Sequence, residues 1–166
     1  MPKTSLRFTR WEFEERVLDF LKKLDLSPQN PQLFFTAFVH RSVLNEATYL
    51  YEDSNERLEF LGDAVLELSI TERLFQDFPK KPEGELTDIR SAVVRGRNLA
   101  MVAKKLGMSE VIQLSRGEFR VAGHENPYIL ANAVEALIRA MYLDFGFEVA
   151  KKWIIKNIYS MLEEIM

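Results

Sequence analysis

Three carboxylates follow one another at helical spacing in SNERLEFLGDAVLEL, residues 54–68. Glu56, Glu59 and Asp63 are three and four residues apart, and the apolar residues around them recur with the period of a helix. At about 100° per residue, the three acids fall within about 60° of one another on one helix. Because like charges at that spacing repel, the segment indicates that something compensates their charge.

A second helical segment, YILANAVEALIRAMYLD at residues 128–144, offers further oxygen ligands in Asn132 and Glu135. Both segments are apolar nearly all round, as in central helices, and Gly62 indicates a close helix crossing, since glycine costs about 1 kcal/mol there. Converging carboxylates repel or take up protons unless a cation compensates them. Oxygen ligands favour Mg²⁺ or Mn²⁺, and such a site suits phosphodiester hydrolysis. The alternative is a solvated acidic face.

The rest of the composition limits other chemistry. The chain has no cysteine, which excludes disulfides and thiol catalysis and favours a cytoplasmic location. The pair His40 and Ser42 is a weak signal, more often a local hydrogen bond than a catalytic site. The formal charge of −3 means that a nucleic-acid function must depend on local patches or metal ions. No apolar run approaches the roughly 18 residues of a membrane span.

Length and hydrophobic periodicity predict one all-α domain over residues 1–166. Asp53 or Ser54 is expected to cap the acidic helix, and Gly107 to end the helix that precedes this glycine. No segment alternates like a strand. Helices are predicted over residues 11–24, 31–39, 53 or 54 to about 78, 86–106, 109–114, 127 to about 144 and 147–165, with polar loops at 40–56 and 115–126.

The stretch NERLEFLGDAVLEL, residues 55–68, closely resembles the signature of the ribonuclease III family, whose catalytic domain cleaves double-stranded RNA. Further family-like blocks are LFFTAFVHRSVLNE, EGELTDIRSAVVRGRNLA, LSRGE and ILANAVEALIRAMYLD, so the resemblance covers about residues 15–160. The resemblance implies a helical homodimer with two active sites. It also implies Mg²⁺-dependent, staggered hydrolysis of double-stranded RNA.

The resemblance assigns roles to individual residues. Glu59, Asp63 and Glu135 match the family's metal-binding carboxylates. Glu56, Glu83 and Glu118 match further acids that line its RNA-cleaving valley. Phe60 matches an aromatic side chain that inserts into the partner subunit, although an ordinary core position is an equally good interpretation of the helix geometry alone.

A basic stripe is a further candidate for RNA binding. Arg90, Arg97 and Lys104 are seven residues apart in the helix predicted over 86–106, within about 40° of one another. Such a stripe is usually a solvated face. Beside an acidic metal valley, we expect it to hold the phosphates of a duplex.

Two features depart from the family pattern. Asn132 occupies a position where the family has a metal-binding Asp, which predicts weaker Mg²⁺ binding and slowed cleavage. The family's C-terminal RNA-binding domain is absent from this chain, which favours a truncated enzyme over a minimal family member. Two alternatives stay open: a catalytically weakened RNA-binding or ribosome-associated relative, and an unrelated helical metal-binding hydrolase.

Overall fold

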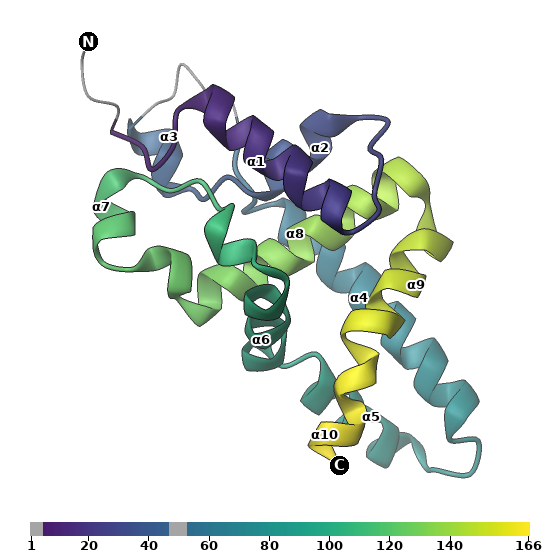
Figure 1. Ribbon diagram of the computed structural model, residues 1–166. Coiled ribbons are helices and arrows are strands. Elements are labelled where there is room, and N and C mark those ends of the chain that lie inside the picture. Colours follow the sequence, from purple (N-terminus) through teal and green to yellow (C-terminus); the bar gives the residue numbers. More distant parts are fainter. Residues whose placement is uncertain (1–4, 47–52) are drawn as a thin grey trace.

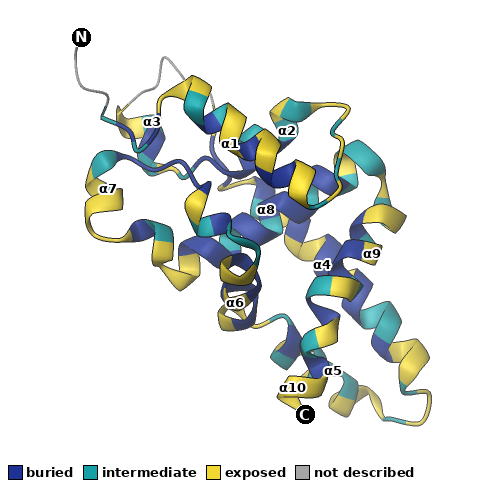
Figure 2. Cartoon of the chain, viewed as in Figure 1, coloured by how far each residue is buried: buried dark blue, intermediate teal, exposed yellow. Residues whose placement is uncertain are grey.

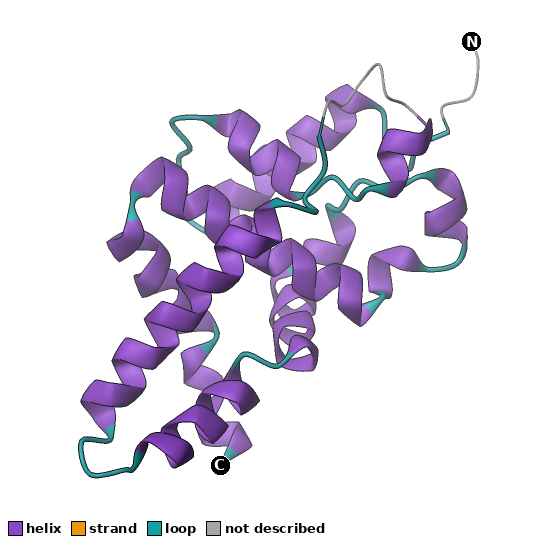
Figure 3. Ribbon diagram, turned by 180° about the vertical axis from the view of Figure 1, so that it is seen from behind, coloured by secondary structure: helices purple, strands orange, loops and turns teal. Residues whose placement is uncertain are grey.

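A computed structural model describes residues 5–46 and 53–166, which form helices joined by short loops (Figures 1 and 3). Within these ranges there is no strand, only two isolated β-bridges, between Leu6 and Ser115 and between Val39 and Gln113. The all-α prediction is therefore confirmed. The helices are α1 (Arg10–Lys23), α2 (Pro31–Ala37), α3 (Ser42–Glu46), α4 (Leu58–Asp77), α5 (Glu83–Val93), α6 (Gly96–Leu106), α7 (Arg116–Arg120), α8 (Pro127–Phe145), α9 (Phe147–Asn157) and α10 (Leu162–Ile165), with 3₁₀ turns at Met108–Glu110, Gly123–Glu125 and Tyr159–Met161.

Helices α4 and α8 cross at the centre of the molecule, with α6 and α9 packed around them (Figure 1). A Cβ atom on Gly62 would lie 1.7 Å from the carbonyl oxygen of Glu135, so the two backbones touch at this glycine. Helix α8 is buried along most of its length (Figure 2). The close crossing expected from Gly62 is therefore confirmed, and it brings the acid-bearing faces of the two helices together.

Several helix ends follow local sequence signals. Thr9 begins α1, its hydroxyl accepting a hydrogen bond from the Glu12 amide at 3.2 Å. Asn126 caps α8 in the same way, accepting from the Tyr128 amide at 2.9 Å, and Pro127 takes the first helical position. Gly107 ends α6 at φ 82°, a left-handed conformation that favours glycine.

The single helix predicted over residues 86–106 is wrong, because α5 ends at Val93 and α6 begins at Gly96. The side chain of Asn98, which is buried, donates a 2.6 Å hydrogen bond to the carbonyl of Ala92. That bond satisfies a carbonyl at the end of α5 that has no partner within its own helix. The intervening Arg95 is extended, at φ −56° and ψ 139°, and redirects the chain.

Other predicted boundaries were also wrong. Helix α4 starts at Leu58, because Ser54 accepts a hydrogen bond from the Glu56 amide within a turn and caps no helix. The helix predicted over 109–114 is confined to the 3₁₀ turn Met108–Glu110, and Gln113 instead pairs with the backbone of Phe38 and His40. The last predicted helix divides after Asn157. The predicted polar loops contain α3 and α7, and residues 47–52 of the first loop lie outside the described residues.

Candidate active site

The crossing of α4 and α8 brings three predicted site acids together. Glu59 and Asp63 come from α4, and Glu135 comes from α8. Burial raises the pKa of Glu135 to about 8, and the charges of Asp63 and Glu59 and a side-chain hydrogen bond to Asp63 contribute to that rise. The raised pKa favours the protonated form of the Glu135 carboxyl at neutral pH. The repulsion expected between converging acids is present, and protonation relieves it.

Glu56 lies before α4, in the turn that precedes Leu58, so the prediction of three acids stacked on one helix was wrong. It still influences the cluster: burial raises the pKa of Glu59, and the negative charge of Glu56 adds to that rise. The guanidinium of Arg41 acts in the opposite direction on Glu59 and lies 3.8 Å from the Glu56 carboxylate. Glu56 is thus close to the acids without sharing their helix.

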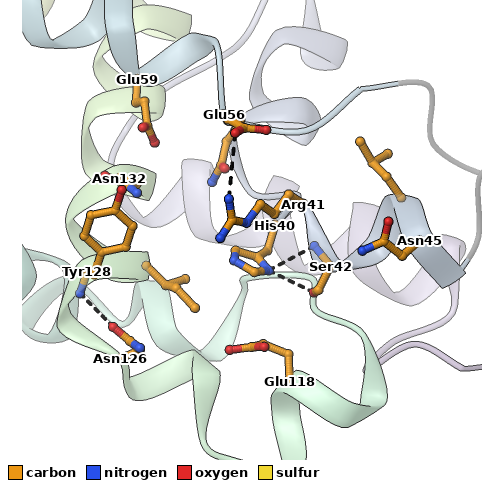
Figure 4. A pocket seen from close by; sticks show the side chains of 13 residues that line it. His40, Arg41, Ser42, Asn45, Glu56, Glu59, Glu118, Asn126, Tyr128 and Asn132 are labelled. Atoms are coloured by element: carbon orange, nitrogen blue, oxygen red, sulfur yellow. Dashed lines mark hydrogen bonds and ion pairs between the residues drawn. The ribbon is translucent and has the colours of Figure 1, made fainter.

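A pocket of about 570 Å³ opens beside the acid cluster (Figure 4). Glu59 and Asn132 lie on one side, and Glu118 reaches in from the other, with His40 and Arg41 between them. The structure therefore brings together four of the predicted residues around this space, namely Glu56, Glu59, Glu118 and Asn132. Asp63 and Glu135 do not line it, but adjoin it through Glu59.

Glu83 is separated from this pocket within one subunit. It begins α5, whose Arg90 packs against Glu67 and Thr71, well along α4 from Glu59. In Figure 1, α5 lies at the opposite end of the molecule from α3 and α7. Its role in an RNA-cleaving valley stays a prediction.

The loop carrying His40, Arg41 and Ser42 forms one wall of the pocket. The Ser42 hydroxyl accepts a hydrogen bond from the Ser115 amide at 3.0 Å, which joins the loop to the segment leading into α7. Ser115 caps α7 by accepting from the Glu118 amide at 3.1 Å, and this cap positions Glu118. Sequence reasoning named Glu118 but missed Arg41, for which the charge between His40 and Ser42 was an available signal.

Tyr128 was also missed. It lines the pocket opposite His40 and is 70% exposed (Figure 4). Its place beside Pro127 at the start of α8 gave no signal beyond helix capping.

The donor set suits a hard divalent cation, because Glu59, Asp63 and Glu135 offer carboxylates and Asn132 offers an amide oxygen. Across residues 5–46 and 53–166, however, no three Asp, Glu or His side chains are grouped so that they could hold a metal ion as they stand. Without a cation, burial and the neighbouring carboxylates favour the protonated form of Glu135. A cation bound here would replace that proton, since metal ligation requires the ionised carboxylate.

Phe60 follows Glu59 on α4 and is 84% exposed, so it is not a core residue. Leu68 and Phe75 are exposed farther along the same helix. A partner subunit would cover such an apolar surface, but the insertion of Phe60 into one stays a prediction.

The prediction that Arg90, Arg97 and Lys104 form a stripe along one helix was wrong, because these residues lie on two helices, α5 and α6. Arg90 of α5 is bound to Glu67 at 2.9 Å and to the Thr71 hydroxyl at 2.9 Å. Arg97 and Lys104 lie on α6, where both are exposed and remain seven residues apart. RNA binding by these two residues stays a prediction, whereas Arg90 has a structural partner.

The protein family described as Ribonuclease-III-like matches residues 30–162 of the chain. The chain belongs to the ribonuclease III family. Curated relatives named Ribonuclease 3 include that of Clostridium tetani, 43% identical over 89% of this chain and 62% of the relative. That of Staphylococcus aureus is 40% identical over 92% of this chain and 63% of the relative. The chain thus spans about three fifths of the length of these ribonuclease III proteins.

Solved structures of the ribonuclease III nuclease domain from Campylobacter jejuni also match. One aligns with a TM-score of 0.76 and 37% identity, covering 85% of this chain and 97% of that one. It is described as showing structural flexibility in a region involved in dimer formation. The resemblance inferred from the signature is therefore confirmed at the level of family and fold. No helix in the described part of this ribonuclease III family member is long and apolar enough to cross a membrane.

Proposed function

We propose that this chain is a magnesium-dependent endoribonuclease that hydrolyses phosphodiester bonds of double-stranded RNA in the cytoplasm. The observation that carries the proposal is the crossing of α4 and α8, which gathers Glu59, Asp63 and Glu135 and raises the pKa of Glu135 to about 8. Acids so placed are destabilised without a cation, and perturbed carboxyl groups cluster at functional sites. Family membership supports the same reaction class.

Glu59, Asp63 and Glu135 would hold Mg²⁺, or Mn²⁺ in its place, with the amide oxygen of Asn132. When bound, the ion supplies a Lewis acid and lowers the pKa of water for attack on phosphorus. Glu135 gives up its proton when it becomes a ligand, so binding should strengthen as pH rises. Glu56 and Glu118 keep the neighbouring pocket acidic.

The same proposal includes a homodimer with one site per subunit, each cutting one strand of the duplex. The exposed aromatic ring of Phe60 supports this arrangement, because a large apolar side chain beside an acidic site suits an interface anchor. Duplex RNA is recognised mainly through shape, phosphates and 2′-hydroxyls. We therefore expect little sequence preference.

Asn132 favours a second candidate, a catalytically weakened RNA-binding or ribosome-associated relative. An amide keeps one oxygen ligand but removes a negative charge, which weakens attraction for a divalent cation. We expect slowed cleavage and not its loss, because Glu59, Asp63 and Glu135 retain their carboxylates.

Incubation with a labelled RNA duplex and a single-stranded control, with Mg²⁺ or with EDTA, tests the proposal. We expect Mg²⁺-dependent cuts in the duplex alone, and none with the Glu135→Gln variant. Binding of the duplex without cleavage at any Mg²⁺ concentration would favour the weakened relative. Cleavage of the single strand in EDTA would contradict the proposal.

A further inference from the structure

Ser42 determines which nitrogen of His40 carries the ring proton. The Ser42 amide donates a hydrogen bond to His40 Nδ1 at 3.1 Å, and the Ser42 hydroxyl lies 2.8 Å from the same atom. A backbone N–H can only donate, so Nδ1 must present its lone pair. The proton of the neutral ring is therefore on Nε2.

The surrounding backbone holds this arrangement in place. The Ser42 hydroxyl uses a lone pair to accept from the Ser115 amide at 3.0 Å, and this leaves its own hydrogen free to point at Nδ1. The His40 amide donates to the Gln113 carbonyl at 3.0 Å, which anchors the residue from its other side. The contact between this loop and the segment before α7 therefore fixes the tautomer of His40.

The Nε2 edge of His40 faces the pocket, opposite the edge bound by Ser42 (Figure 4). Within residues 5–46 and 53–166, no side chain or carbonyl accepts a hydrogen bond from Nε2. Burial lowers the pKa of His40, and the nearby charge of Glu118 only partly opposes this, which favours the neutral ring at pH 7. The pocket therefore contains an uncharged donor with no partner in the described structure.

We propose that His40 binds RNA directly by donating its Nε2–H to a backbone oxygen, either a phosphate oxygen or a 2′-hydroxyl. The inference rests on the proposed function and adds a substrate-binding residue to it. A neutral donor suits this position, because it adds no further positive charge to that of Arg41, which already lies 3.8 Å from Glu56. His40 can therefore hold an RNA oxygen without weakening the charge that attracts the metal.

Two substitutions of His40 test the roles of its Nε2 and Nδ1 atoms separately. In His40→Gln the amide nitrogen can reach the place of Nε2, whereas in His40→Asn the shorter amide reaches only the place of Nδ1. Binding of a short RNA duplex is measured by fluorescence anisotropy in EDTA, so that cleavage does not interfere. We expect about fivefold weaker binding for the Asn variant and less than about twofold for the Gln variant, the effect of one neutral hydrogen bond. Thermal unfolding of both variants checks that they fold.

Equal weakening in both variants, or no weakening in either, would overturn the proposal. A duplex with 2′-deoxy sugars identifies the acceptor: the difference between Asn and Gln disappears if a 2′-hydroxyl accepts, and persists if a phosphate does. Nitrogen-15 NMR of the RNA-free protein should show the Nε2–H tautomer, and an Nδ1–H tautomer would also overturn the proposal. If the unaltered chain bound no duplex, both the proposed function and the role of His40 would fail, whereas the tautomer would still be measured.

Discussion

The Glu135→Gln substitution should remove a pH dependence from the stability of the metal-free protein. The pKa of Glu135 is about 8 in the folded chain, against an ordinary value of 4.5. Between these two values the folded state binds the proton more tightly than the unfolded state does. Stability therefore falls as pH rises through this window, and is fully present below it. Glutamine cannot ionise, so the variant lacks this loss.

The size of the effect follows from the same pKa values. At about 1.36 kcal/mol per pKa unit, the difference from 4.5 to about 8 sets an upper limit of about 5 kcal/mol. Glu135 is only partly buried and lies next to a solvated pocket, so water screens much of the repulsion. We expect the variant to keep about 2 kcal/mol more stability than the unaltered chain across the window.

Urea unfolding in EDTA at about pH 5 and about pH 8, at one protein concentration, measures this difference. Glu148→Gln, an exposed position on α9, is the matched control and should behave like the unaltered chain. Mg²⁺ at the higher pH should stabilise the unaltered chain more than Glu135→Gln. If the free energy of unfolding changed equally with pH in the unaltered chain and in Glu135→Gln, the inference that α4 and α8 bring repelling acids together would be refuted.

Four further variants test other parts of the structure. Gly62→Ala should destabilise the fold by more than about 3 kcal/mol in urea unfolding, because its Cβ would lie 1.7 Å from the Glu135 carbonyl oxygen; an unchanged midpoint would contradict the close crossing. Phe60→Ala should weaken dimerisation by about 2 kcal/mol in sedimentation at micromolar concentration, and a monomeric parent chain would contradict the dimer. Replacing both Arg97 and Lys104 by Ala should weaken duplex binding and flatten its salt dependence, whereas Arg90→Ala should mainly lower thermal stability. Equal salt slopes for the double variant and the unaltered chain would show that Arg97 and Lys104 form only a solvated face.

Local sequence signals predicted the parts of the fold whose hydrophobic period is unbroken. Helices α1 and α8 lie within a residue of their expected bounds. Thr9 and Asn126 accept hydrogen bonds from amides in the first turns of these helices, and Pro127 takes the first position of α8. The crossing at Gly62 was predictable as well, because a glycine inside an apolar helix lowers helix stability and is useful where a second backbone comes close.

The break between α5 and α6 depends on a contact that hydrophobic periodicity does not encode. Asn98 bonds to the carbonyl of Ala92, and the same apolar spacing would fit either one helix or two. Gly96 and Asn98, both poor helix formers, were the available hint.

Only part of the candidate site, like only part of the fold, could be predicted from the sequence. The signature identified Glu56, Glu59 and Asp63, and the blocks downstream of it identified Glu118, Asn132 and Glu135. Glu118 and Asn132 line one pocket. Neither the signature nor these blocks could give the raised pKa of Glu135 or the tautomer of His40, because both depend on burial and contacts that only the fold determines. Glu56 was misplaced for a related reason, since the turn around Ser54 delays the start of α4.

Single-turnover cleavage of an RNA duplex over a Mg²⁺ titration, comparing the chain with its Asn132→Asp variant, tests the central claim most directly. We predict slow, Mg²⁺-dependent cleavage by the chain, and a variant that reaches a higher rate at a lower Mg²⁺ concentration, each tenfold gain corresponding to about 1.4 kcal/mol of barrier. Duplex binding without metal should be similar in the two forms. Equal rates at every Mg²⁺ concentration would contradict a metal site built from α4 and α8 that includes position 132.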